Sequence, residues 1–138
     1  MTSQPIIQYL NTDLDLIVDV DPAVLTVELE ANDLYVHVTA GEDGLWYLWC
    51  EDLKDGDPET NIVNLLNSIG SLSESARKIW ESCTKREFDI GYDCGDEPWG
   101  FTQGVSADSI KRIADYGISL RITLYPYRES SSQPVSLD

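Results

Sequence analysis

The sequence predicts an α+β domain in which three to four helices pack on one face of a mainly antiparallel or mixed sheet. Several segments alternate apolar and polar residues, as half-buried strands do. Other segments repeat apolar residues at helical spacing. The 138 residues are 42% apolar and 25% charged, which fits one globular domain over residues 1–138. Residues 1–4 and 129–138 are rich in Ser, Gln and Pro, and we expect them to be flexible tails.

The first half of the chain predicts three strands and a short helix. Residues 13–20 alternate strictly and form a strand with its acids facing water. Asp21-Pro22 is a helix-start signal and predicts a helix over 22–31, although the alternation in that segment leaves a strand as the alternative. Residues 34–39 form the next strand. Residues 45–50 are apolar on both faces, which is typical of a central strand. That position places three aromatic residues in the core: Trp46, Tyr47 and Trp49.

The second half predicts two helices and then a strand. Asp57-Pro58 starts a helix whose apolar residues continue to Ile69. A second helix follows over 73–83, with Ser71-x-x-Glu74 resembling a capping box near its start. Residues 86–94 alternate as a strand.

One more helix and strand complete the predicted fold. Ser106 caps a helix that runs through Ala114 and is stopped by Gly117. Residues 118–125 then alternate as the last strand. With helices on one face, the other sheet face is expected to be open and acidic, and its side chains would be Asp13, Asp15, Asp19, Tyr35, His37, Glu87, Asp89 and Arg121.

The charge of the chain is unusual in size and in distribution. Twenty-five acidic residues face nine basic ones, a net charge of −16, and residues 1–60 carry fourteen of the acids with Lys54 as their one base. Such a surface repels nucleic-acid phosphates and anionic membrane surfaces, so we expect neither as a partner. It favours a basic protein partner.

The expected location is the cytoplasm. There is no signal-peptide pattern and no apolar stretch of the roughly 20 residues that a membrane span requires. The three cysteines share no C-x-x-C spacing, so a reducing compartment is expected. The oligomeric state does not follow from the sequence.

Two groups of residues are the candidate interaction sites. The acidic N-terminal group consists of Asp13, Asp15, Asp19, Asp21, Glu28 and Glu30. The second is a glycine-rich loop carrying Asp93, Asp96, Glu97 and Trp99. That loop could instead supply carboxylates for acid–base catalysis with Arg86, Tyr92 or His37, ligands for a hard cation, or only caps for a tight turn. No catalytic residue, metal ligand or cofactor is assigned, since His37 is the only histidine and no nucleotide-binding glycine motif is present.

A resemblance bears on these alternatives. The run KIWESCTKREFDIGYDCGDEPW and the ending GISLRITLYP resemble uncharacterised small bacterial α+β proteins, including acidic ones encoded beside toxins as immunity partners. The resemblance covers about residues 73–127 and implies a binding role without assigning a site. The leading hypothesis is therefore a non-enzymatic protein-binding or inhibitor domain that acts through an acidic surface. The alternatives are a small enzyme using the carboxylates of residues 86–101 and a structural domain with no ligand.

Overall fold

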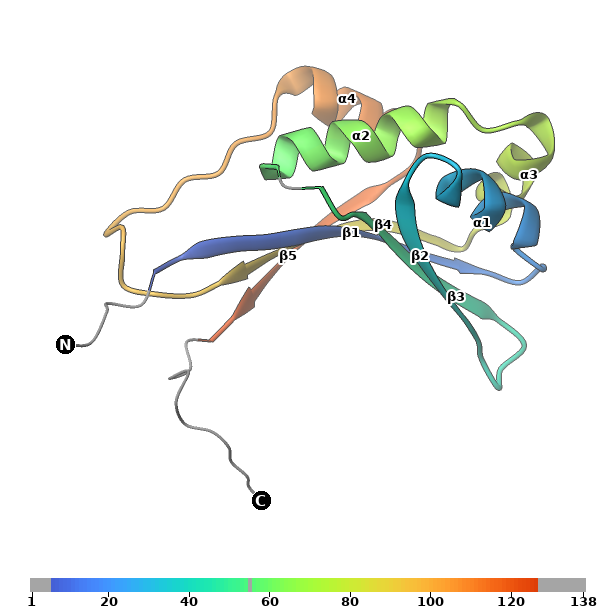
Figure 1. The fold of residues 1–138 in the computed structure, drawn as a ribbon, viewed down its shortest axis with the longest axis horizontal. Coiled ribbons are helices and arrows are strands. Elements are labelled where there is room, and N and C mark those ends of the chain that lie inside the picture. The colour runs from blue at the N-terminus through green and yellow to red at the C-terminus, as the bar shows by residue number, and fades with distance from the viewer. Residues whose placement is uncertain (1–5, 55, 127–138) are drawn as a thin grey trace.

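The computed structural model describes residues 6–54 and 56–126, so the expected tails at 1–4 and 129–138 lie outside the described residues. The fold is a mixed sheet of five strands with four helices, which confirms the predicted α+β class. Figure 1 shows that the helices lie on one face of the sheet. No helix in the described part of the chain is long and apolar enough to cross a membrane. The elements are β1 (Gln8–Val18), α1 (Ala23–Glu30), β2 (Leu34–Ala40), β3 (Trp46–Asp52), α2 (Pro58–Gly70), α3 (Glu74–Ser82), β4 (Lys85–Asp93), α4 (Ala107–Asp115) and β5 (Ser119–Tyr125).

The strands lie in the order β2-β3-β1-β4-β5, with β1 at the centre. β1 is antiparallel to both of its neighbours, and β2 is antiparallel to β3. β4 and β5 are parallel, because the chain returns through α4 on the helix side before it enters β5. The two edges of the sheet are therefore β2 and β5.

The core lies between the sheet and the helices. On β1 the alternate residues Leu14, Leu16 and Val18 are almost fully buried, as the period-two pattern predicts. The predicted stripe of α2 packs over them from the helix layer, with Ile62 and Leu66 among its fully buried residues. β1 begins earlier than predicted, at Gln8, and ends at Val18 rather than Val20.

The segment 22–31 forms the predicted helix and not the alternative strand, with Pro22 as the N-cap and Ala31 as the C-cap of α1. Leu25 and Leu29, four residues apart, are both fully buried, while Val27 is 63% exposed. Spacing of three to four residues puts side chains on one side of a helix. Two buried leucines at that spacing therefore decide the conformation of α1.

The prediction that residues 45–50 form a central, fully buried strand is wrong. β3 is second in the sheet order, and only alternate residues, Leu48 and Cys50 among them, are buried. Trp46 packs partly buried against the core. Tyr47 and Trp49 point to the opposite, helix-free face, with Tyr47 38% exposed. Helices cover one face of the sheet, so a strand that is apolar on both faces must expose one of its two rows.

The starts of α3 and α4 are capped by serines, Ser73 and Ser106, and each cap serine donates hydrogen bonds to a carboxylate of another helix. The predicted capping box at Ser71 is wrong, because the N-cap of α3 is Ser73 and Ser71 is the C-cap of α2. Glu28 of α1 accepts hydrogen bonds from the backbone N–H and hydroxyl of Ser73. Glu59 of α2 accepts the corresponding bonds from Ser106, and these bonds together with one from Ser109 hold the pKa of Glu59 below its ordinary value.

Replacing the N-cap of α4 should weaken the fold. Ser106→Ala removes the hydroxyl that accepts from Ser109 N and donates to Glu59, so we expect the free energy of unfolding to fall by about 1 kcal/mol. Because the pKa of Glu59 is lowered, the part that its carboxylate adds is present above the ordinary value of 4.5 and is lost as the pH falls through the lowered value, whereas the bond from Ser109 N to the Ser106 hydroxyl remains. Urea unfolding at neutral and acid pH measures both effects.

The matched control is Ser75→Ala, a change of the same residue type at an exposed position inside α3. Alanine is the better helix former, so stability should be unchanged or slightly raised. Equal losses in the two variants would contradict the capping role.

Candidate binding face

The face of the sheet opposite the helices, called here the open face, carries most of the predicted polar residues. Strand register places these side chains on it: Tyr35, His37, Tyr47, Trp49, Glu51, Asn11, Asp13, Asp15, Lys85, Glu87, Asp89, Arg121 and Thr123. Among the described residues, no helix lies on this side (Figure 1). Seven of the eight residues predicted to share the face do so. Asp19 does not, because β1 ends at Val18 and Asp19 lies exposed in the bend that follows.

Three carboxylates meet at the centre of the open face. Asp13 of β1 stands directly opposite Asp89 of β4. Glu51 of β3 lies on the other side of Asp13, one position beyond the pair Leu14–Cys50. The Asn11 amide donates to Asp13 Oδ1 at 3.2 Å and to Glu51 Oε1 at 3.3 Å, so it holds these two groups side by side. Like charges at opposite positions of neighbouring strands destabilise a sheet.

Burial and the repulsion among these carboxylates have a clear effect on the pKa of Asp13. Burial of the carboxyl, and then the negative charges of Glu51, Asp15 and Asp89, raise the pKa of Asp13 from 3.8 to about 7. No positive charge contributes to the shift. A strand carboxylate that resists ionisation near neutral pH marks a place where negative charge is in excess.

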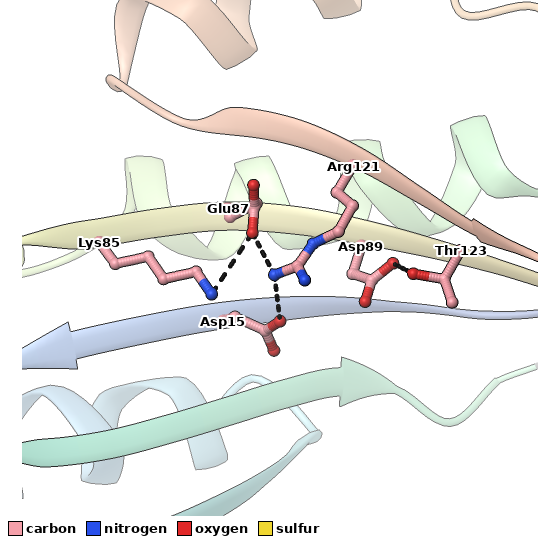
Figure 2. Close-up of polar contacts among 6 residues, drawn as sticks. All are labelled: Asp15, Lys85, Glu87, Asp89, Arg121 and Thr123. Atoms are coloured by element: carbon pink, nitrogen blue, oxygen red, sulfur yellow. Dashed lines mark hydrogen bonds and ion pairs between the residues drawn. The ribbon is translucent and has the colours of Figure 1, made fainter.

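Of the described residues, two basic ones lie on the open face, and both contact Glu87; Arg121 is also in register with Asp89 (Figure 2). Arg121 of β5 forms ion pairs with Glu87 and, at 3.8 Å, with Asp15. Lys85 pairs with Glu87 at 3.4 Å. Burial raises the pKa of Asp15, while Lys85 and Arg121 act against that rise.

The remaining carboxylates of the centre have weaker compensation. Asp89 accepts a hydrogen bond from the Thr123 hydroxyl at 2.6 Å, a neutral donor (Figure 2). Within residues 6–54 and 56–126, no ion pair reaches Asp13, Glu51 or Asp89. These three carboxylates, called here the acidic centre, therefore have no described basic residue paired with them, and the nearest ion pairs are those of Asp15 and Glu87.

Aromatic rings border the acidic centre on β2 and β3. The Trp49 ring lies 5.3 Å from Tyr35 and 5.5 Å from His37, centroid to centroid, and its plane is nearly parallel to that of His37. A hollow of about 390 Å3 lies beside Trp49 and is lined by Asp15, Ile17, His37, Thr39, Tyr47 and Lys85 among others. Rings of this kind can stack on a guanidinium or attract an ammonium group.

A second hollow opens at the other end of the face. It has about 480 Å3 and is lined by Leu10, Asn11, Glu51, Asp93 and Tyr125. Two of these residues are acidic and none is basic, so this hollow extends the negative surface away from Arg121 and Lys85. It also places Asp93, from the predicted acidic loop, next to the acidic centre.

The structure separates the other predicted interaction residues from this face. Asp21 is exposed after β1, and its carboxylate accepts a hydrogen bond from Ala23 N at the start of α1. Glu28 and Glu30 belong to α1 in the helix layer, where Glu28 is engaged by Ser73. The six N-terminal acids therefore do not form one patch.

The acidic loop after β4 leaves Asp96, Glu97 and Trp99 exposed, with Trp99 fully so. The Glu97 carbonyl accepts from Ile7 N, which fixes the loop beside the start of β1. Of the three residues considered for catalysis, Tyr92 alone lies beside the loop, where its ring contacts Phe101 and lines a hollow together with Asp93. Arg86 donates to the backbone carbonyls of Trp80 and Cys83, and His37 lies on the far edge strand.

Sequence reasoning missed Tyr47, Trp49 and Glu51 as members of the open face. The sequence held no signal that separates the two rows, because both are largely apolar and each ends in an acid, Glu51 in one and the buried Asp52 in the other. Strand order was also needed, since only the pairing of β3 with β1 brings Glu51 beside Asp13.

The arrangement offers no prepared metal centre. In the part of the chain that the structure describes, no three His, Cys, Asp or Glu side chains are grouped so that they could hold a metal ion. The chemistry of the open face is that of carboxylates and aromatic rings that can bind cationic groups.

Comparison of the chain with models of protein families, with curated proteins and with solved structures finds no match. What the open face can bind therefore follows from its own charges, rings and hydrogen bonds.

Proposed function

We propose that this chain is a non-enzymatic protein-binding or inhibitor domain, and that its open face binds a basic protein. The observation that carries the proposal is the acidic centre of Asp13, Glu51 and Asp89 on a sheet face that no described helix covers. A lysine or arginine of a partner would supply the positive charge that this centre lacks.

Energetics favour a binding role over a purely structural one. Like charges on neighbouring strands and a partly buried carboxyl with a raised pKa both work against folding. Asn or Ser would fill these positions without that repulsion. A basic partner converts the same charges into attraction, and long-range attraction also raises the rate of association.

The aromatic border supplies the second part of a binding surface. Tyr and Trp contribute strongly to the energetics of protein interfaces, because their large rigid rings bury much area at little entropic cost. Trp49 and Tyr35 are partly exposed beside Asp15 and Glu51, so one partner arginine could contact a ring and a carboxylate together.

The acidic centre also indicates a class of natural partner. A basic nuclease or similar toxin would present a positive groove, which an acidic face of this kind complements. The expected resemblance of about residues 73–127 to uncharacterised small bacterial α+β proteins, some of them acidic immunity partners, agrees with that partner class. Three cysteines without a C-x-x-C spacing support a reducing compartment such as the cytoplasm as the place of action.

A defined cationic probe tests the proposal without knowledge of the natural partner. We expect a capped hexa-arginine peptide to bind the full chain at about 20 mM salt and to bind much more weakly at about 300 mM, where charges are screened. The triple variant Asp13→Asn, Glu51→Gln, Asp89→Asn should raise the dissociation constant about tenfold or more, since three charges next to the contact are removed. Isothermal calorimetry measures the constants, and amide chemical shifts locate the contact.

The control removes the same number of charges from the helix layer: Glu74→Gln, Glu81→Gln, Asp108→Asn. We expect a change of about twofold or less, because these charges lie across the sheet from the probe. Equal weakening in both triple variants would show that only net charge matters, and that outcome, like a failure to bind at low salt, overturns the proposal.

A further inference from the structure

The outer strand β5 exposes an apolar row that its neighbour buries. Leu120, Ile122 and Leu124 are 44%, 59% and 62% exposed. Their in-register partners on β4, which point to the same face, are at most 3% exposed: Phe88, Ile90 and Tyr92. The helix layer therefore covers β4 and stops short of β5, where these three aliphatic side chains face solvent.

The backbone of β5 is open along the same residues. The Tyr125 carbonyl accepts from Cys94 N at 2.9 Å, so the backbone groups of Tyr125 point toward the β4 side. Backbone groups alternate along a strand, and those of Leu120, Ile122 and Leu124 consequently point outward. Within the described residues no strand pairs with this edge.

β5 also lacks the usual protection of an edge strand. Residues 119–125 contain no proline, and the register with β4 runs without a bulge. Its one charge is Arg121, which lies on the open face and is engaged by Glu87. Unprotected edges of this kind pair readily with another strand.

We propose that β5 pairs antiparallel with β5 of a second copy of this chain, around a twofold axis at Ile122. In that register Ile122 meets its own copy, Leu120 meets Leu124, and Arg121 meets Thr123. Apolar residues thus face apolar ones on the helix side and polar residues face polar ones on the open side. Leu120, Ile122 and Leu124 would each exchange both backbone hydrogen bonds with the opposite residue. Such self-complementarity is what a twofold interface requires.

The charge distribution favours a second copy at β5 and disfavours it at β2, the other edge. Residues 1–60, which hold fourteen acids and one base, form β1, α1, β2 and β3. Two copies joined at β2 would bring these acidic halves together. Joined at β5, they keep the acidic halves at the outer ends of one continuous sheet, with both Arg121 side chains near the axis.

The adjoining hollow gives the second copy room to dock. It has about 390 Å3 and is lined by Ile7, Tyr92, Phe101, Ile122 and Leu124 among others. Phe101 is 41% exposed at its border. A single strand edge buries less than the roughly 800 Å2 per partner of a standard stable interface, so we expect a dissociation constant on the order of micromolar.

Sedimentation velocity of the full chain from about 1 to 100 μM tests the proposal. We expect a reversible monomer–dimer equilibrium in the wild type. Ile122→Lys should raise the dissociation constant about 100-fold or more, since one substitution places two like charges opposite each other across the axis. Val38→Lys is the matched control, because Val38 is a 38%-exposed apolar residue on the other edge strand, and dimerisation should persist.

A mixing experiment separates pairing from misfolding. Ile122→Lys and Ile122→Glu should each be monomeric alone, and an equimolar mixture should form a heterodimer in which lysine meets glutamate. A wild type that is monomeric throughout this range, a Val38→Lys variant that dissociates equally, or a mixture that stays monomeric overturns the proposal. The inference does not depend on the proposed function, because pairing at β5 leaves the acidic centre uncovered.

Discussion

Leu14→Ala should lower the free energy of unfolding by about 3 kcal/mol, the largest loss expected from one substitution on β1. Leu14 is fully buried at the centre of the sheet, between Cys50 on β3 and Phe88 on β4. Truncation removes apolar burial and leaves a cavity that the surrounding strands cannot close. Urea unfolding followed by tryptophan fluorescence measures the change.

The matched control is Leu53→Ala, where the same side chain is 67% exposed after β3. We expect a change within about 0.5 kcal/mol. A loss at Leu14 no larger than this would mean that the helix face of β1 is not the core of the protein.

Asp13→Asn should raise the free energy of unfolding by about 1–2 kcal/mol near pH 8, whereas Leu14→Ala lowers it. This figure allows for solvent screening, because the carboxyl is only half-buried. Asp13 precedes Leu14 in the chain but points to the open face, where burial, Glu51, Asp15 and Asp89 raise its pKa to about 7. Asparagine keeps the shape and still accepts from Asn11, but it carries no charge. Urea unfolding at pH 5 and pH 8 measures the gain.

The pH dependence follows from the direction of the shift. The folded protein holds the Asp13 proton more tightly than the unfolded chain does, whose carboxyl has the ordinary value of 3.8. The resulting stabilisation is fully present below about pH 4 and is lost as the pH rises through about 7. The advantage of the asparagine variant over the wild type should therefore grow from pH 5 to pH 8.

Asp19→Asn is the control, because it removes the same charge from an exposed bend just after the strand. Its effect should stay within about 0.5 kcal/mol at both pH values. A gain at Asp19 equal to that at Asp13 would attribute the effect to net charge and not to the acidic centre.

Local pattern predicted most of the fold. The alternation along β1 and the helical spacing in α2 depend only on which residues of that segment are apolar. Strands, helices and the open face could therefore be predicted from each segment separately. For residues 22–31 the pattern left a strand as the alternative, and the burial of Leu25 and Leu29 in the structure decides for the helix.

The candidate site depends on contacts between distant segments, and these could not be predicted. Asp13 and Asp89 are opposite because β1 pairs with β4, and Glu51 joins them because β3 pairs on the other side. The engagement of Glu28 by Ser73 is likewise set by how α1 packs against α3. Composition indicated an acidic surface, but strand order decided which carboxylates lie together.

The most direct test of the proposed binding face measures stability and binding on one variant, Asp13→Asn. If Asp13 is held on the open face for a basic partner, the variant unfolds with a higher free energy near pH 8 and binds the hexa-arginine peptide several-fold more weakly at low salt. A variant that gains stability and binds the peptide as tightly as the wild type would contradict the account.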